Sequence, residues 1–526
     1  MGSPEPEASS ASSRKPPPPL GHVRQSPLLP LARLGTEARR PGCPPPPWDW
    51  PRLRPAGGLE AGLSPRPAFL RRRCCRECSR ARQQEEGWRQ AVDSAATGER
   101  TLISCVQKAN MLPEKDPKRQ GEKDPQEDPS VTLFREYLRI KTVQPEPDYD
   151  TAVKFLERIG SELGLQCQKV EVCPGRVITI LTWKGTNPHL RSILLNSHTD
   201  VVPVFEEYWR YDPFSAFKDS EGNIYARGAQ DMKCVSIQYI EAIRKLKAEG
   251  RQFPRTVHMS FVPDEEIGGH KGMEMFVKRP EFATLNVGFA LDEGLANPTD
   301  TFTVFYGEKC PWWIKVKVEG NPGHGSRFIE NTAAEKMHRV ITSFLEFRER
   351  EKQRLKSEKH LTLGDVTSLN LTMLNGGISF NVVPSEMSAA FDIRIPPTVD
   401  LKAFEEQLTA WCRAAGEGVS YEFHQKYTDQ SVTSTEESDP WWKAFSGTCR
   451  DMNMKLQCEI FPAATDSRYI RAAGHPAIGF SPMNRTPVLL HDHNEFLNEQ
   501  VFLRGIEIYA HLISALASVL PLQAEA

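Results

Sequence analysis

The stretch Ser192-Ile-Leu-Leu-Asn-Ser-His-Thr-Asp-Val-Val-Pro203 carries the pattern on which the fold prediction rests. Its aliphatic run, Ile193 to Leu195, indicates a buried strand that leads straight into His198 and Asp200. Residues two apart in a strand project to the same face, so these two side chains are expected together where the strand ends. Ligands bind at this carboxyl edge of open α/β sheets. His198 is therefore either a metal ligand that Asp200 orients or half of an ordinary His–Asp pair.

Four later stretches place acids or histidines in the same way, after an apolar run or a glycine-containing turn. A helix cap or a solvated loop acid would explain any one of them. Together they supply the nitrogen and oxygen ligands of a two-metal site, as in aminopeptidase-like hydrolases. The stretches are Arg227-Gly-Ala-Gln-Asp-Met-Lys233, Val257-His-Met-Ser-Phe-Val-Pro-Asp-Glu-Glu266, Gly288-Phe-Ala-Leu-Asp-Glu293 and Val488-Leu-Leu-His-Asp-His493.

Strands and helices alternate around these stretches. Apolar periodicity predicts helices over 151–163 and 233–247, with a short helical segment near 271–278. Strands are predicted over 168–172, 176–183, 193–197, 256–262 and 286–292. This order predicts an α/β layer with a largely parallel sheet.

A second pattern begins after Cys310 and suggests an inserted unit. The elements expected there are strand 312–319, helix 332–350, strands 366–373 and 386–395, helix 400–414 and strand 418–424. This β-α-β-β-α-β order is ferredoxin-like. The α/β pattern returns from about 437. We therefore predict an α/β domain over 126–307 and 429–526, with a smaller domain over 308–428 inserted into it.

Residues 1–125 lack apolar periodicity and are rich in proline and arginine, which predicts a disordered extension. A transit peptide and a proline-rich docking segment are the alternatives. Beyond residue 80 acids outnumber bases, which argues against nucleic acid as a partner. No run approaches the roughly 20 apolar residues that span a bilayer, so no membrane contact is expected. Cysteines scattered singly through the rest of the chain indicate reduced thiols and a cytoplasmic protein.

Several motifs resemble one family of enzymes. Asn196-Ser-His-Thr-Asp200, Gly228-Ala-Gln-Asp-Met-Lys-Cys234 and Pro263-Asp-Glu-Glu-Ile-Gly-Gly269 are similar to motifs of the dinuclear zinc amidohydrolases. That family includes aminoacylases, acetylornithine deacetylase and carboxypeptidase G-type enzymes. The aminoacylase branch shares Ala463-Ala-Thr-Asp466 and Gly479-Phe-Ser-Pro-Met-Asn484 as well. The resemblance covers about 129–518, and residues 1 to about 120 show none of it.

The resemblance implies two zinc ions per subunit and a role for each residue at the strand ends. Glu265 would be the general base that activates a zinc-bound hydroxide, and Asp200 would orient His198. Asp292 is the alternative to Glu293 as a ligand, and His493 the alternative to His491. The ligands carried over by position are His198, Asp231, Glu266, Glu293 and His491.

The resemblance also implies a zinc-peptidase-like α/β catalytic domain. The inserted ferredoxin-like unit would be its lid or dimerisation domain, and it contributes further residues. His324, in Gly320-Asn-Pro-Gly-His-Gly-Ser326, would reach the partner subunit's site and stabilise the oxyanion, which implies a homodimer. Asn381 and Arg394 would contact the substrate carboxylate. The implied activity is hydrolysis of small-molecule N-acyl-L-amino acids, N-acetyl with neutral side chains among them. The alternatives are a dipeptidase or other deacylase of the same fold, and a non-enzymatic interaction protein with an incomplete metal site, although no ligand or base is missing.

Overall fold

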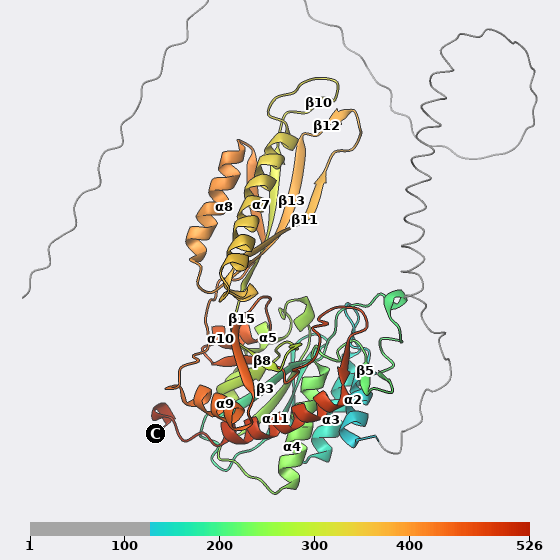
Figure 1. The fold of residues 1–526 in the computed structure, drawn as a ribbon, viewed down its shortest axis with the longest axis vertical. Coiled ribbons are helices and arrows are strands. Elements are labelled where there is room, and N and C mark those ends of the chain that lie inside the picture. Colours follow the sequence, from blue (N-terminus) through green and yellow to red (C-terminus); the bar gives the residue numbers. More distant parts are fainter. Residues whose placement is uncertain (1–126, 526) are drawn as a thin grey trace, which may run out of the picture. The chain divides into compact units, whose positions relative to one another are not determined.

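The computed structural model describes residues 127–525. The predictions for residues 1–125, a disordered extension or its alternatives, lie outside the described residues. The described residues form two separate main sheets, and Figure 1 shows helices packed around the larger one. Its eight strands run in the order β1 (Gln166–Cys173), β2 (Arg176–Trp183), β6 (Val257–Val262), β3 (Ser192–His198), β7 (Val287–Asp292), β16 (Ala477–Phe480), β8 (Thr301–Glu308) and β15 (Lys455–Phe461).

The α/β fold class is confirmed, but the expected largely parallel sheet is wrong in detail, because the sheet is mixed. Strands β6, β3, β7 and β16 are mutually parallel, and β15 runs parallel to β8. The pairs β1–β2, β2–β6 and β16–β8 are antiparallel. The first of these follows from the two-residue turn Pro174-Gly175, because a hairpin can only join antiparallel strands. The parallel centre is what brings several carboxyl ends to one edge.

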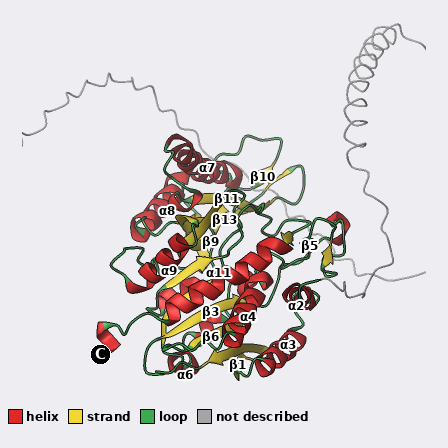
Figure 2. Ribbon diagram, turned by 60° about the horizontal axis from the view of Figure 1, so that its bottom comes forward, coloured by secondary structure: helices red, strands yellow, loops and turns green. Residues whose placement is uncertain are grey.

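Both faces of the central strand β3 are buried. Ile193 and Leu195 pack in one hydrophobic cluster and Leu194 in another, on the opposite face, which explains the uninterrupted aliphatic run. Figure 2 shows α4 and α11 crossing one face of the sheet. The first cluster is covered by α2 (Pro129–Leu138), α3 (Tyr149–Glu162), α4 (Lys233–Ala248), α9 (Pro440–Asp451) and α11 (Glu499–Ala517). The second is covered by α5 (Met273–Phe276), α6 (Pro280–Thr284) and α10 (Ser467–Ala472).

The smaller main sheet has a hydrophobic core of its own. Its antiparallel strands run in the order β11 (Ser368–Gly376), β13 (Glu386–Ile395), β9 (Cys310–Glu319) and β14 (Val419–Lys426). Helices α7 (Ala333–Ser357) and α8 (Leu401–Ala415) pack on it, and the capping box of Thr332 and Glu335 starts α7. The β-α-β-β-α-β order is thus confirmed. The domain boundaries placed at 308 and 428 remain predictions.

Two further small sheets complete the described part of the chain. One pairs β10 (Gly323–His324) with β12 (Val382–Val383). The other joins β17 (Phe496–Asn498), β5 (Asn223–Tyr225) and β4 (Phe217–Lys218). Among the described helices, none combines the length and the apolar character that crossing a membrane requires.

Candidate metal centre

The five predicted ligands meet at one edge of the larger sheet. His198 is the last residue of β3, Glu293 follows β7, and Glu266 lies in the short helix η2 (Glu265–Ile267) after β6. Asp231 stands just before α4, and His491 lies on the loop that leads to β17. Since β6, β3 and β7 are parallel, their carboxyl ends share this edge. The structure therefore brings these five side chains together at one edge.

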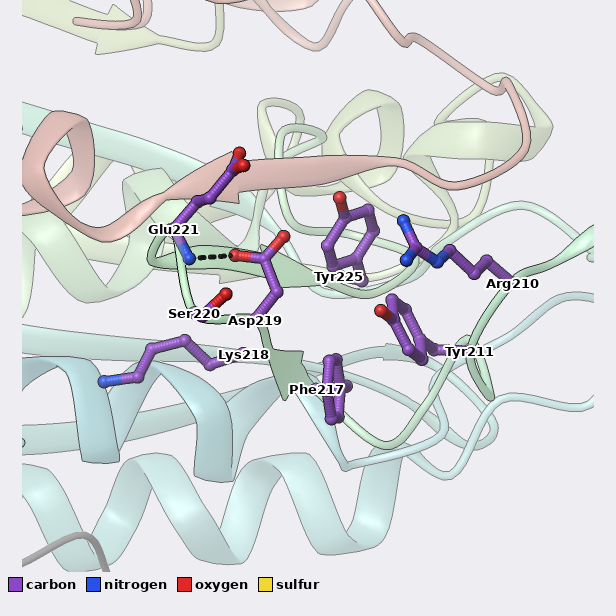
Figure 3. A pocket seen from close by; sticks show the side chains of 8 residues that line it. All are labelled: Arg210, Tyr211, Phe217, Lys218, Asp219, Ser220, Glu221 and Tyr225. Carbon is purple, nitrogen blue, oxygen red and sulfur yellow. Dashed lines mark hydrogen bonds between the residues drawn. The ribbon is translucent and has the colours of Figure 1, made fainter. Parts of the chain in front are cut away.

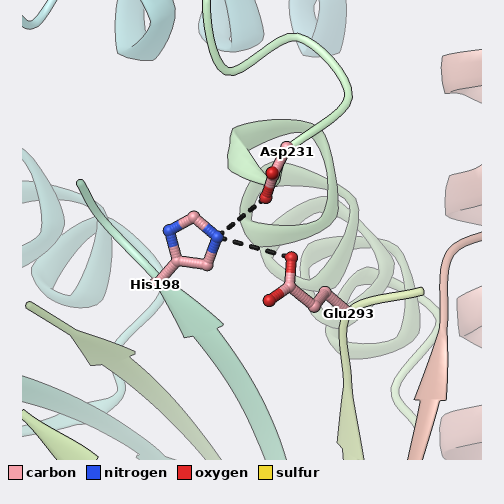
Figure 4. A group of neighbouring side chains, drawn as sticks. All are labelled: His198, Asp231 and Glu293. Carbon is pink, nitrogen blue, oxygen red and sulfur yellow. Dashed lines mark hydrogen bonds and ion pairs between the residues drawn. The ribbon is translucent and has the colours of Figure 1, made fainter. Parts of the chain in front are cut away.

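The ligand atoms form two groups that share Asp231. His198, Asp231 and Glu293 make one group, and Asp231, Glu266 and His491 the other, with the ligand atoms of each within 4.8 Å of one another. Figure 4 shows the Asp231 and Glu293 carboxylates on the same nitrogen of His198, at 2.9 and 3.4 Å. His491 Nε2 lies 3.3 Å from Asp231 Oδ2 and 3.0 Å from Glu266 Oε2. Asp231 thus offers one oxygen to each group, which is the arrangement of a bridging carboxylate.

The chemistry of these groups fits a pair of divalent cations. Burial, reinforced by the charge of Asp231, raises the pKa of Glu266 to about 7 and that of Glu293 well above its usual range. Glu266 Oε1 is buried without a hydrogen-bond partner among the described residues. Several carboxylates that are buried together repel one another, and bound cations would relieve this repulsion. Imidazole nitrogen and carboxylate oxygen are ligands that zinc accepts.

Hydrogen bonds separate the ligand candidates that the sequence left in competition. Asp292 accepts from Asn196 Nδ2 at 3.0 Å and from Ser467 Oγ at 2.8 Å, so its carboxylate is occupied away from the two groups. Glu293 is the acid that the structure brings to His198. His493 packs against Tyr208, with ring centroids 5.0 Å apart, and belongs to neither group. The geometry therefore favours Glu293 and His491.

Asp200 lies beside His198, as predicted from the strand, but its main chain is closer to the ring than its carboxylate is. His198 Nδ1 lies 2.9 Å from the backbone carbonyl oxygen of Asp200 but 3.7 Å from its carboxylate. The carboxylate instead accepts from the amides of Glu265 and Glu266, at 3.1 and 3.2 Å, and from Gln144 at 2.8 Å. The ring of His198 thus contacts the main chain of Asp200, while the Asp200 side chain bonds to the helix η2. Strand periodicity predicted the proximity but not which atoms meet.

Glu265 is a buried carboxyl beside the two groups. Burial raises the pKa of its side chain well above the usual range, although the charge of His198 opposes this shift. Asp264, which precedes it, has a left-handed backbone with φ of 62°. Arg176 and Tyr149 each donate to the Asp264 carboxylate at 2.7 Å. Sequence reasoning missed these two partners, because nothing in the sequence signals contacts between residues about 90 to 115 positions apart.

The residues predicted from the inserted unit belong to neither ligand group: His324 lies in β10, Arg394 in β13, and Asn381 just before β12. His324 is exposed, and its Nδ1 lies 2.8 Å from Ser326 Oγ. The backbone carbonyl of Asn381 accepts from Gly325 at 2.8 Å, so the loops of His324 and Asn381 lie side by side. Arg394 donates Nε and Nη2 to the Asp392 carboxylate at 2.7 and 3.0 Å.

A cavity of about 340 Å³ lies elsewhere, on the sheet of β17, β5 and β4 (Figure 3). Asp219 in its wall accepts from the amides of Glu221 and Asn223, both at 2.9 Å. Lys218 pairs with Glu127 and Glu499 at 2.9 and 3.0 Å. Because partners within the chain satisfy these polar groups, the two ligand groups are the better candidate site.

Comparisons with known proteins show which family the chain resembles. The model of peptidase family M20/M25/M40 matches residues 194–515. Aminoacylase-1A of Rattus norvegicus is 69% identical over 399 residues, which cover 76% of this chain and 98% of that protein. Aminoacylase-1 of Homo sapiens is 68% identical over 398 residues, with 76% and 98% covered. Aminoacylase-1 of Dictyostelium discoideum is 50% identical over 406 residues, with 75% and 99% covered.

Solved structures share the fold at lower identity. An M20 family metallo-carboxypeptidase from Sulfolobus solfataricus has a TM-score of 0.61 at 17% identity, covering 74% of this chain and all of that one. A dinuclear metal binding M20 peptidase from Bacillus subtilis has a TM-score of 0.54 at 15% identity, covering 74% and 98%. At this identity the likeness establishes the fold alone.

Proposed function

This chain belongs to the peptidase family M20/M25/M40, and we propose that it hydrolyses N-acyl-L-amino acids to a free L-amino acid and a carboxylate. Its identity to aminoacylases over nearly their whole length supports hydrolysis of N-acyl amino acids by a metallohydrolase and confirms the predicted aminoacylase resemblance. The dipeptidase alternative is not favoured. The L configuration, a preference for N-acetyl substrates with neutral side chains, and zinc as the metal are finer parts of the proposal.

One observation carries the chemistry: Asp231 joins two ligand groups beside the buried Glu265. We assign His198, Asp231 and Glu293 to one metal and Asp231, Glu266 and His491 to the other. When bound, the two ions lower the pKa of a water molecule and polarise the acyl carbonyl. Glu265 takes the proton from the attacking water and delivers it to the nitrogen as the amide C–N bond breaks. Asp200 keeps Glu265 in place through the amide hydrogen bond.

Asn381 and Arg394 remain the proposed contacts of the substrate carboxylate. Asp392 takes two of the five N–H donors of Arg394 and fixes the plane of its guanidinium group. A planar, fixed guanidinium suits bidentate binding of a carboxylate. Asn381→Ala removes an amide and Arg394→Met removes a positive charge from the proposed carboxylate contacts. Because both changes weaken substrate binding, each should raise KM more than it lowers kcat.

We also propose a homodimer in which His324 completes the partner subunit's site. Apolar side chains on the two loops around it are fully exposed, with Phe328 at 109%, Ile378 at 95% and Phe380 at 113% of the reference area. Such a patch is typical of a protein interface. The edge strand β11 of the smaller sheet offers unpaired backbone groups nearby.

Complementation tests the shared site. Mixed dimers of Glu265→Gln and His324→Ala subunits contain one site with an intact base and an intact histidine. A random one-to-one mixture should therefore regain about a quarter of wild-type activity, because half of the dimers are mixed and half of their sites are intact. A mixture of Glu265→Gln and Glu266→Gln subunits serves as the control. Each of these changes impairs the site of the subunit that carries it, so a mixed dimer has no intact site and should regain no activity. Failure to regain activity would refute the contribution of His324 across subunits.

Activity and location have direct tests. Turnover of N-acetyl-L-methionine, beside a dipeptide and the D enantiomer, tests the reaction, and metal analysis of the purified protein tests zinc. Turnover of the dipeptide alone would overturn the aminoacylase assignment. We propose a cytoplasmic location, which the free thiols of all seven cysteines in the described residues support. Fractionation of cells that express the full chain tests this location.

A further inference from the structure

The segment that carries Asp231 and the segment that carries His491 meet at a buried ion pair. Arg227 Nη1 lies 2.9 Å from Glu495 Oε2, with 3% and 0% of the two side chains exposed. Arg227 stands four residues before Asp231, and Glu495 four residues after His491. We propose that this pair is a positioning device, which holds both residues in the geometry that a metal needs. The inference rests on the proposed metal centre.

Glu495 fixes the turn that presents Asp231. Its Oε2 accepts from the amide of Gly228 at 3.1 Å, and its Oε1 accepts from the amides of Gln230 and Asp231 at 2.6 and 3.3 Å. Gly228 has a φ of 89°, which other residues rarely adopt, and a Cβ there would lie 2.9 Å from Val201 Cγ1. The turn therefore depends on one buried carboxylate that collects three main-chain donors. Without it these donors would stay buried and unpaired.

Arg227 reaches the other segment. Its Nη2 donates to the backbone carbonyl of His491 at 3.3 Å, and its guanidinium carbon lies 5.3 Å from the ring centroid of Trp209. His491 has a φ of 58°, a left-handed conformation that costs energy in a residue with a Cβ. The donated hydrogen bond helps to hold this conformation. His491 is also the most exposed ligand, with 49% of its side chain accessible, so its position depends on such contacts.

The side chain of Gln230 joins the same two segments. Its Nε2 donates to the backbone carbonyls of Pro487 and Phe496, at 3.1 and 2.8 Å, and its Oε1 accepts from the amide of Leu489 at 3.1 Å. Three neighbouring side chains thus fasten the Asp231 turn to the His491 loop. By contrast, His198 and Glu293 stand at the ends of the buried strands β3 and β7. The ion pair should therefore matter most for the metal group of Asp231, Glu266 and His491.

Cobalt(II) titration of the metal-free full-length protein tests the positioning role. Glu495→Gln keeps the size of the side chain but offers one acceptor oxygen in place of two. The group of Asp231, Glu266 and His491, which contains the exposed His491, should fill second. The affinity for this second equivalent of cobalt should fall about 10- to 100-fold, the usual cost of losing a group that orients a ligand. The affinity for the first equivalent should change much less, and the visible absorption of the second cobalt should broaden. Equal losses in both steps, or none, would overturn the proposal.

A matched control separates positioning from general stability. Glu525 forms a similar pair with Arg255, with 4% and 0% of the two side chains exposed, and it accepts from the amides of Arg191 and Leu522. Glu525→Gln should lower the unfolding temperature without changing either cobalt affinity. If Glu525→Gln weakens the second step as much as Glu495→Gln does, the positioning role is refuted.

A second variant covers a failure of Glu495→Gln to fold. Arg227→Lys keeps the positive charge beside Glu495, but a single ammonium cannot also reach the His491 carbonyl as the guanidinium fork does. It should weaken the second cobalt step in the same direction, and wild-type affinity in this variant would contradict the proposal. A wild-type chain that binds no cobalt would instead refute the proposed metal centre itself. The two failures are therefore distinguishable.

Discussion

Replacing Asp200 by asparagine would test whether its carboxylate places Glu265 for catalysis. The carboxylate is fully buried and accepts from the amides of Glu265 and Glu266, at 3.1 and 3.2 Å. Asparagine has the same shape but only one acceptor oxygen. Its NH2 group would face the second amide, donor against donor. The same NH2 group would also face Gln144 Nε2, and reversing the Gln144 side chain would turn its oxygen toward the Asp264 carboxylate, which Nε2 now contacts at 3.2 Å.

The expected loss follows from the hydrogen bonds that asparagine cannot make. A hydrogen bond to a charged group contributes about 1.5–3 kcal/mol. If this energy holds Glu265 in its reactive position, its loss should lower kcat about 10- to 100-fold, since each tenfold change in rate corresponds to about 1.4 kcal/mol. The assay is steady-state hydrolysis of N-acetyl-L-methionine, together with metal analysis and thermal unfolding. Metal content should stay near that of the wild type.

Glu525→Gln is again the control. Like Asp200, Glu525 accepts from two backbone amides, and its third partner is an arginine side chain. Both variants should unfold at lower temperature, but only Asp200→Asn should turn over slowly. A wild-type kcat in Asp200→Asn, with a loss of stability equal to that of the control, would show that the carboxylate serves the fold alone. The placement argument would then be wrong.

Four further predictions concern the base, the partner's histidine, the metals and one buried histidine. Glu265→Gln should keep its metal content but lose about 10²–10⁴-fold in kcat, and near-normal turnover would refute its role as general base. His324→Ala should lose about 10²–10³-fold in kcat without a change in unfolding temperature; retained activity would contradict the oxyanion role. Chelation should abolish activity and lower the unfolding temperature, and added zinc should restore both. The unfolding temperature changes because ions at 100 times their Kd stabilise the fold by about 2.7 kcal/mol per site. An unchanged unfolding temperature would argue against both ligand groups. Burial lowers the pKa of His258 from 6.5 to about 4, so between these pH values the unfolded chain binds a proton that the folded chain does not. The free energy of unfolding should therefore fall by about 3 kcal/mol as the pH drops through this range. In His258→Gln, the free energy of unfolding from urea titrations should depend less on pH over the same range. An equal dependence on pH in both proteins would refute this prediction.

The pattern of apolar runs predicted the elements that position the site. The strand expected at 193–197 is observed as Ser192–His198, and the helix expected at 233–247 as Lys233–Ala248. These predictions succeed because burial on both faces of a strand, or on one side of a helix, leaves a period in the sequence itself. The antiparallel direction of β2 against β6 leaves no such period. It depends on which edges meet after the chain has folded.

The sequence by itself determined the kinds of ligand and their place at strand ends, because each strand and the polar residue after it are neighbours along the chain. Tertiary structure alone decided that Asp231 gives one oxygen to each group, that Asp200 holds the helix η2 rather than the ring of His198, and that Arg227 and Glu495 join two segments more than 250 residues apart. The reason is physical. A hydrogen bond depends on distances of about 3 Å between particular atoms, and across such separations only the folded core sets those distances.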